Sequence, residues 1–132
     1  MVGAMLGAHQ PGDELGWHYD PNDGVVTLMV QRCSGGGCFE FAHMNRPDDT
    51  SEAVQRDAID AVMSGQWPGT RQLDQKQGDF TIFNGSRSLH RVTPVEAGPD
   101  RIMLLLSYDG CPDQVFSEDV HRDFFGRGAS TR

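Results

Sequence analysis

The sequence predicts a mainly β domain with one inserted α-helix and a short helix near the C-terminus. Three features support this prediction: short apolar runs rich in β-branched residues, frequent Gly, Pro and Asn-Gly turn signals between them, and one longer segment with apolar residues at helical spacing. Many short strands with such punctuation favour a jelly-roll or a related antiparallel barrel. The 132 residues fit a single domain, 1–132.

The first half of the chain predicts a β-hairpin. Residues 1–15 carry scattered glycines and little periodicity, which indicates a short strand or a loop. Residues 25–31 form an apolar, β-branched run without polar alternation, as in a strand buried on both faces. The glycines at 35–37 can adopt the positive φ of a tight turn, so residues 38–42 are expected to return as the strand that pairs with 25–31.

The inserted helix is predicted to begin near residue 49 and to end at Gly65. Either Asp49 or Thr50 can cap its N-terminus, with Glu52 in the first turn. Apolar residues recur at helical spacing at Val54, Ala58, Ile59 and Val62. A second, short helix is expected over about residues 117–125, ended by the glycine that follows.

The second half of the chain predicts further short strands. They are expected at 71–73, 80–83, 89–93 and 101–108, and Asn84-Gly85 is a strong turn signal between two of them. The last of these strands is the most apolar in the chain.

Composition limits the class of partner. Lys and Arg number 11 and Asp and Glu number 19, so the formal net charge is −8. A chain without a basic field has little to hold phosphates, so neither nucleic acid nor an anionic membrane is an expected partner. No apolar run reaches the roughly 20 residues that cross a bilayer, and the first residues lack a basic signal segment, which predicts a cytoplasmic protein.

The three cysteines are an odd number without a Cys-x-x-Cys pair, so they indicate neither a disulfide framework nor a structural zinc site. Cys33 and Cys38 flank the glycine turn and could face each other across the predicted hairpin. Two reduced thiols at strand ends are the preferred interpretation.

His18 and Asp20 form half of a candidate metal site. Residues two apart in an extended chain point to the same side, so this imidazole and this carboxylate face one point. A second imidazole from His90 would complete two histidines and one carboxylate on one face of an ion, the facial arrangement of non-haem Fe(II) sites. Taken singly, His18 and Asp20 also fit an exposed turn, and His90 fits a core histidine bonded to the backbone. Together the three favour a metal.

Arg101 follows His90 by eleven residues and is expected to hold a carboxylate near this metal. Strand alternation places it on one face with Met103, Leu105 and Ser107. A guanidinium that faces inward from an apolar strand needs a partner, and its planar fork meets a carboxylate through two hydrogen bonds. A surface salt bridge is the alternative.

These residues resemble the His-x-Asp, His and Arg pattern of the Fe(II)/2-oxoglutarate-dependent dioxygenases. The resemblance covers roughly residues 16–127, including Trp17-His18-Tyr19-Asp20, Ser88-Leu89-His90-Arg91 and Arg101. The wider pattern of the sequence is similar to that of the subgroup of hydroxylases and halogenases that act on amino acids and other small molecules. The resemblance implies a double-stranded β-helix, a cupin-like jelly-roll. Longer relatives also carry an N-terminal helical half, which this chain is expected to lack.

The resemblance also implies the chemistry. His18, Asp20 and His90 would bind Fe(II), no further catalytic residue is expected, and Arg101 would bind the co-substrate 2-oxoglutarate. With O₂, the enzyme would convert 2-oxoglutarate to succinate and hydroxylate a small molecule, an amino acid or a derivative of one. Asp20 favours hydroxylation, because related halogenases carry a small residue in its place.

Several other side chains are assigned from the pattern. Some branches of the family have a Ser two residues after the Arg; Met103 stands here, so a second donor to the co-substrate is expected elsewhere. Its candidates are Thr27, Thr81 and Tyr108. Trp17 and Tyr19 flank the ligands and are expected to point away from them into the core, with the lining of the site as the alternative. The remaining histidines are expected on the surface or in loops: His9, His43 and His121.

Two other classes of function stay open at this point. One is a cupin-like protein that binds a metal without 2-oxoglutarate, for which Arg101 would not be needed. The other is a non-catalytic fragment that pairs with another chain as a homodimer through exposed apolar surface.

Overall fold

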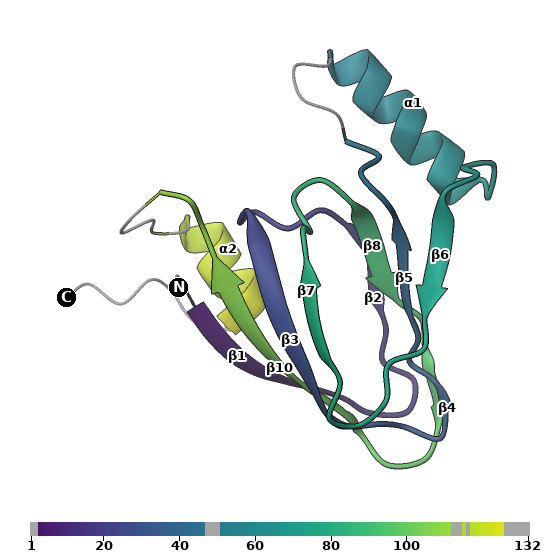
Figure 1. Cartoon of the computed structure of the whole chain (residues 1–132), viewed down its shortest axis with the longest axis vertical. Helices are drawn as coiled ribbons and strands as arrows, with labels where there is room; N and C mark the ends of the chain where they lie inside the picture. The colour runs from purple at the N-terminus through teal and green to yellow at the C-terminus, as the bar shows by residue number, and fades with distance from the viewer. Residues whose placement is uncertain (1–2, 47–50, 112–114, 116, 126–132) are drawn as a thin grey trace.

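Two four-stranded antiparallel sheets face each other in the computed structural model, which describes residues 3–46, 51–111, 115 and 117–125 (Figure 1). The first sheet has the strand order β1-β10-β3-β7, and the second has the order β2-β8-β5-β6. A two-stranded sheet, β4-β9, lies at the end of the molecule where the two large sheets come together.

The strands are β1 (Gly3–His9), β2 (Leu15–His18), β3 (Gly24–Gln31), β4 (Gly35–Gly36), β5 (Phe39–Ala42), β6 (Thr70–Leu73), β7 (Phe80–Phe83), β8 (Leu89–Val92), β9 (Val95–Ala97) and β10 (Arg101–Tyr108). The helices are α1 (Glu52–Met63) and α2 (Glu118–Phe125). The structure therefore confirms a mainly β chain with one inserted helix and a short helix near the C-terminus.

The predicted hairpin of 25–31 with 38–42 is wrong. β3 pairs with β10 and β7 in the first sheet, whereas β5 pairs with β6 and β8 in the second. Gly36 and Gly37 do adopt positive φ, 65° and 60°. Instead of reversing β3 onto itself, they carry the chain to the opposite sheet, and Gly37 N–H donates to the carbonyl of Pro94 at 2.9 Å. The turn chemistry was correctly predicted, but the pairing partner was not.

The helix α1 packs at one end of the second sheet, against Ala42 at the end of β5 and Leu89 at the start of β8 (Figure 1). Its N-cap is Ser51, whose hydroxyl accepts from the Val54 N–H at 3.5 Å. The predicted caps at residues 49 and 50 lie outside the described residues. The buried Val62 packs with Ala42 and Leu89, and this cluster is extended by the half-buried side chains of Trp17, Tyr19, Ile59 and Trp67. Trp17 and Tyr19 therefore pack in the core behind the sheet, as predicted, and both also border the cavity between the sheets, which was the alternative.

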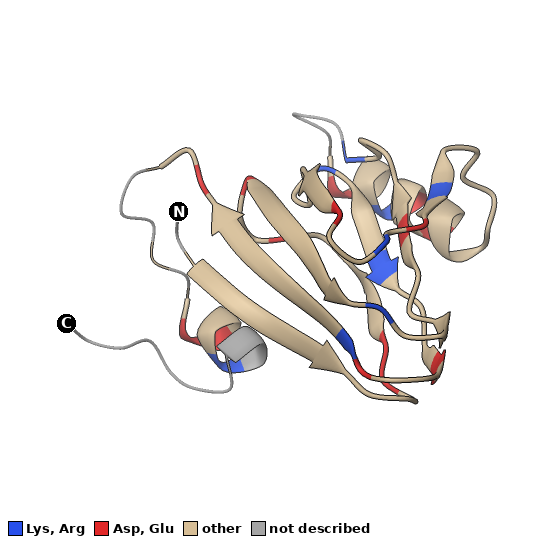
Figure 2. Cartoon of the chain, turned by 60° about the horizontal axis from the view of Figure 1, so that its bottom comes forward, with Lys and Arg blue, Asp and Glu red and all other residues tan. Residues whose placement is uncertain are grey.

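The outer face of the first sheet is apolar and uncovered by the described residues. Register places Leu6, Leu104, Leu28 and Phe80 in one row across all four strands, with Ala4, Leu106, Val26 and Ile82 in the next. The Ile82 side chain is 82 % exposed. Figure 2 shows these strands almost free of charged residues, which lie mainly in loops and on the helices. No described helix is long and apolar enough to cross a membrane.

Candidate metal centre

His18, Asp20 and His90 come together on the inner face of the second sheet. β2 and β8 are antiparallel neighbours, and their register sets His18 directly opposite His90. Alternation along β8 turns Leu89 and Arg91 toward the other face, where the Arg91 guanidinium lies over the Trp17 ring. Two residues beyond His18, Asp20 meets the same point just after β2 ends. These three are the only group of metal-ligand type that the described part of the chain assembles.

The distances suit one shared ion. The Nε2 atoms of His18 and His90 lie 3.5 and 3.4 Å from Asp20 Oδ1, and the two imidazole ring centres are 4.1 Å apart. Ligand atoms about 2.1 Å from a metal and roughly 90–110° apart are about 3.0–3.5 Å from each other. The chemistry of this donor set, two neutral nitrogens and one carboxylate, fits a divalent transition metal.

Backbone carbonyls fix both imidazoles in the tautomer that a metal needs. His18 Nδ1 is 2.8 Å from the carbonyl oxygen of Gly16, and His90 Nδ1 is 2.9 Å from that of Ser88. A carbonyl only accepts, so each Nδ1 carries a proton and each Nε2 faces Asp20. Nε2 donates to the carboxylate while the imidazole is protonated, and it presents its lone pair to a metal once it has lost that second proton. Such a carbonyl contact also fixes the orientation of a ligand ring.

The charges of the three groups are coupled. Burial by itself raises the pKa of Asp20, but hydrogen bonds from His18 and His90 and their positive charge outweigh it, so that the pKa lies well below its usual range. Burial lowers the pKa of His18, but the bonds to Asp20 and to the Gly16 carbonyl outweigh it and leave the pKa raised. Asp20 is therefore ionised at neutral pH and supplies the negative charge that a cation requires.

Gly85 confines Asp20 from the other side. The Asp20 N–H donates to the Gly85 carbonyl at 3.1 Å, which ties the segment after β2 to the turn between β7 and β8. A Cβ built on Gly85 would overlap the Asp20 carboxylate. The Asn84-Gly85 turn predicted from the sequence is thus also a steric wall of the site.

A cavity of about 550 Å³ separates the two sheets and connects the three residues with Arg101. This size lies within the roughly 300–1,000 Å³ of small-molecule sites. The second sheet contributes His18, Asp20 and His90, and the first contributes Arg101, with Met103 and Leu105 on the same face of β10 as predicted. Aromatic side chains surround His90 on the cavity side: the rings of Phe83 and Phe39 lie 4.9 and 5.6 Å from it.

Arg101 is a buried cation without an acidic partner among the described residues. Its side chain is 3 % exposed, so the alternative of a surface salt bridge is wrong. Its Nε donates to the carbonyl of Gly37 at 3.0 Å, and one terminal nitrogen donates to Gln75 Oε1 at 3.4 Å. Burial lowers the pKa of Arg101, although the nearby thiols of Cys33 and Cys38 act in the opposite direction. The remaining guanidinium donors are available for an anion in the cavity.

Sequence reasoning missed Gln75. It lies in the loop between β6 and β7, is 6 % exposed, and bridges Arg101 to Thr81, whose hydroxyl accepts from Gln75 Nε2 at 3.1 Å. A lone Gln in a polar loop carries no periodic signal. Of the predicted second donors, Thr27 and Thr81 line the cavity, while Tyr108 is exposed at the far end of β10 and does not.

Sequence reasoning was also wrong about His9. His9 ends β1 with a half-buried side chain that lines the cavity, whereas His43 is exposed. His121 lies in α2 and does not line the cavity.

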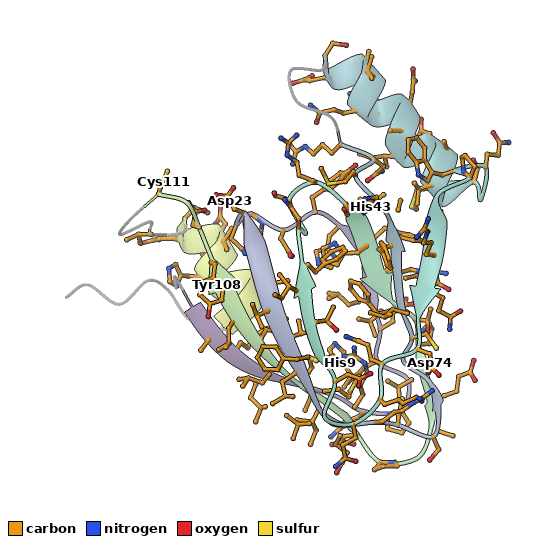
Figure 3. The ribbon with its side chains drawn as sticks, in the orientation of Figure 1. His9, Asp23, His43, Asp74, Tyr108 and Cys111 are labelled. Atoms are coloured by element: carbon orange, nitrogen blue, oxygen red, sulfur yellow. The ribbon has the colours of Figure 1, made fainter. Side chains whose placement is uncertain are left out.

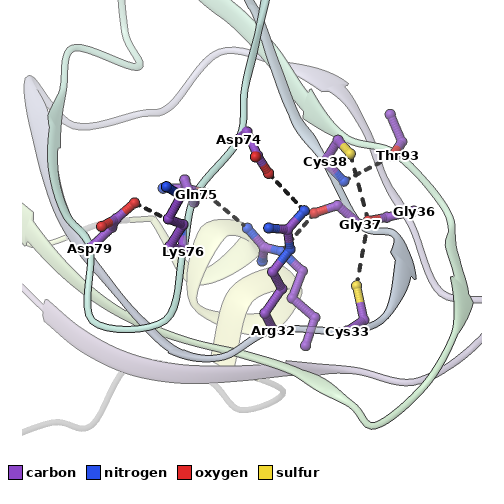
Figure 4. A network of polar contacts seen from close by, with 11 residues as sticks. Arg32, Cys33, Gly36, Gly37, Cys38, Asp74, Gln75, Lys76, Asp79 and Thr93 are labelled. Carbon is purple, nitrogen blue, oxygen red and sulfur yellow. Dashed lines mark hydrogen bonds and ion pairs between the residues drawn. The ribbon is translucent and has the colours of Figure 1, made fainter.

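The cysteines are free thiols, in agreement with the prediction. Cys33 Sγ and Cys38 Sγ lie 3.4 and 3.6 Å from the carbonyl of Gly36 (Figure 4). Cys33 and Cys38 flank the segment that passes from the first sheet to the second, and not the turn of a hairpin.

No protein-family model matches this chain, and no curated protein matches it. The assignment of function therefore depends on the site itself.

Proposed function

We propose that this protein is an Fe(II)- and 2-oxoglutarate-dependent oxygenase that hydroxylates a small molecule, an amino acid or a derivative of one. The observation that supports this most directly is that one cavity contains both a metal-ready His18, Asp20 and His90 group and the buried, unpaired Arg101. A metal site alone would fit many proteins. The additional buried cation is what favours an anionic co-substrate.

The fold belongs to the proposal as well. Two facing antiparallel sheets with the orders β1-β10-β3-β7 and β2-β8-β5-β6 support a jelly-roll of the double-stranded β-helix type. Strands β1, β2, β3 and β5 alternate between the two large sheets, and so do β6, β7, β8 and β10. Such a barrel brings ligands from non-adjacent strands to one interior point.

Each residue has a defined task in this proposal. His18, Asp20 and His90 would hold Fe(II), which with the keto acid and O₂ supplies the oxidative chemistry: substrate C–H, 2-oxoglutarate and O₂ become substrate C–OH, succinate and CO₂. Arg101 would bind the distal carboxylate. A buried charge without a counter-charge is costly, so a carboxylate at Arg101 satisfies both groups.

The protein contributes orientation and exclusion of water. The carbonyls of Gly16 and Ser88 hold the imidazole rings, and Gly85 limits the positions open to Asp20. Phe39 and Phe83 supply an apolar wall beside His90. Retention of Asp20 favours hydroxylation over halogenation, because a carboxylate occupies the position where a halide would bind.

The test is turnover. Purified protein is loaded with Fe(II) and incubated with 2-oxoglutarate, O₂ and a panel of amino acids, and succinate and hydroxylated product are measured. We expect product in amounts equal to succinate, loss of both metal binding and turnover in Asp20→Ala, and wild-type behaviour in His43→Ala, which is exposed outside the cavity.

The same experiment separates the alternatives. An anaerobic titration of the Fe(II)-loaded protein with 2-oxoglutarate should give the weak visible band of an iron-bound keto acid. Metal binding without this band would refute the proposal and favour a metal-binding protein of another class.

A further inference from the structure

We propose that His9 is the second side chain, beside Arg101, that binds the distal carboxylate of the co-substrate. This inference rests on the proposed function. It assigns the second donor to a residue in β1, in place of the hydroxyl that Met103 cannot provide.

The position of His9 supports this assignment first. Alternating residues of β1 are half-buried, and Met5, Gly7 and His9 line the cavity. Register sets His9 directly opposite Arg101 in the neighbouring strand β10. Facing residues of an antiparallel pair have Cβ atoms about 4.5–5.5 Å apart, so one carboxylate can reach both side chains. Figure 3 shows His9 between the two sheets, at the end where they converge.

The unsatisfied hydrogen bonding of His9 supports it second. His9 Nδ1 is buried and has no hydrogen-bond partner. Buried polar atoms are nearly always paired, because an unpaired one costs its full desolvation free energy. Arg101, across the pair, retains guanidinium donors that Gly37 and Gln75 do not use. A carboxylate between the two would satisfy both side chains.

The other candidate donors are farther from Arg101 in the sheet or outside the cavity. Thr81 lies on β7, which β3 separates from β10, and its Oγ1 accepts from Gln75 Nε2 at 3.1 Å; Tyr108 does not line the cavity. Thr27 lines the cavity but faces Leu105 across the strand pair, two positions farther along β10 than Met103. Of these candidates, His9 is the one that lies directly opposite Arg101 in the neighbouring strand.

The charges around His9 predict a proton-linked affinity. Burial and the Arg101 charge lower the pKa of His9, while Asp13, which accepts from the Gln10 N–H at 2.9 Å, acts in the opposite direction. The thiols of Cys33 and Cys38 act on the pKa of Arg101, in the direction opposite to burial. A bound carboxylate offsets the positive charge of Arg101 and so raises the pKa of His9. Between the pKa of His9 in the free protein and its higher pKa in the complex, binding takes up a proton. Affinity then increases as pH falls through that range.

The experiment is anaerobic calorimetry of the Fe(II)-loaded protein near pH 6.5. It is titrated with 2-oxoglutarate and with 2-oxobutyrate, a keto acid that lacks the distal carboxylate, in two buffers of different ionisation enthalpy. His9→Leu should weaken 2-oxoglutarate binding about tenfold to a hundredfold, as expected for a hydrogen bond to a charged group. It should leave 2-oxobutyrate binding unchanged and abolish proton uptake.

Two further variants keep the test decisive. His9→Asn replaces Nδ1 by an amide nitrogen, so it should restore part of the affinity without proton uptake; His43→Leu is the exposed control. Thermal melting checks that each variant folds.

Wild-type affinity and proton uptake in His9→Leu or His9→Asn would overturn the role of His9 and leave the proposed function intact. Failure of the wild-type protein to bind 2-oxoglutarate would instead refute both.

Discussion

Replacing Gly85 by alanine should disable the metal centre by displacing Asp20. A Cβ on Gly85 would overlap Asp20 Oδ2 and lie 2.5 Å from Asp20 Cγ, whereas ordinary van der Waals contact begins at 3.4 Å, so the two groups must separate by at least about 0.9 Å. Ligand distances in a metal site tolerate only about 0.2 Å. The Asp20 N–H bond to the Gly85 carbonyl ties the two segments together and opposes a larger rearrangement.

We therefore expect the affinity for Fe(II) to fall about tenfold to a hundredfold. This is the range seen when a group that positions a metal ligand is lost. Competition with a chromophoric chelator measures it, under anaerobic conditions. The matched control is Gly24→Ala, because a Cβ on Gly24 would meet only the Phe83 carbonyl oxygen, at an ordinary contact distance of 3.7 Å, and Gly24 does not line the cavity. Unchanged iron affinity in Gly85→Ala, with a normal melting temperature, would refute the idea that Gly85 fixes the position of Asp20.

Three further predictions concern pH, the co-substrate and the outer surface. Because the pKa of His18 is raised, protons compete with the metal for this imidazole at pH values above the ordinary imidazole pKa. The apparent affinity for iron should therefore fall by up to about tenfold per pH unit as the pH drops through the raised pKa. An iron affinity that does not change between about pH 6 and 8 would contradict this. Arg101→Lys keeps the charge but removes the fork, so the KM for 2-oxoglutarate should rise about tenfold or more; an unchanged KM would show that no carboxylate binds there. The apolar outer face of the first sheet is expected to drive association of copies, and Ile82→Lys should reduce it; sedimentation of the wild-type chain as a clean monomer would rule this out.

The positions of several strands along the chain were predicted closely from the sequence. The bounds of β7 and β10 match the expected 80–83 and 101–108, and β8 ends one residue before the predicted 89–93. These runs are apolar, β-branched and bounded by turn residues, so their conformation follows from their own side chains. The partner of each strand depends on contacts between distant residues, which is why the predicted pairing of 25–31 with 38–42 failed.

The same division holds for the site. The sequence by itself determined that His18 and Asp20 face one point and that Arg101 shares a face with Met103, because alternation in a strand is a local property. Only the tertiary structure decided that His90 pairs opposite His18 and that Gly85 abuts Asp20.

His9 and Gln75 came to Arg101 in the same way, through strand pairing and a buried loop. They lie 92 and 26 residues from Arg101 along the chain, and neither belongs to a periodic pattern. Closure of two sheets around one cavity brings such residues together, and no local preference of the chain encodes that closure.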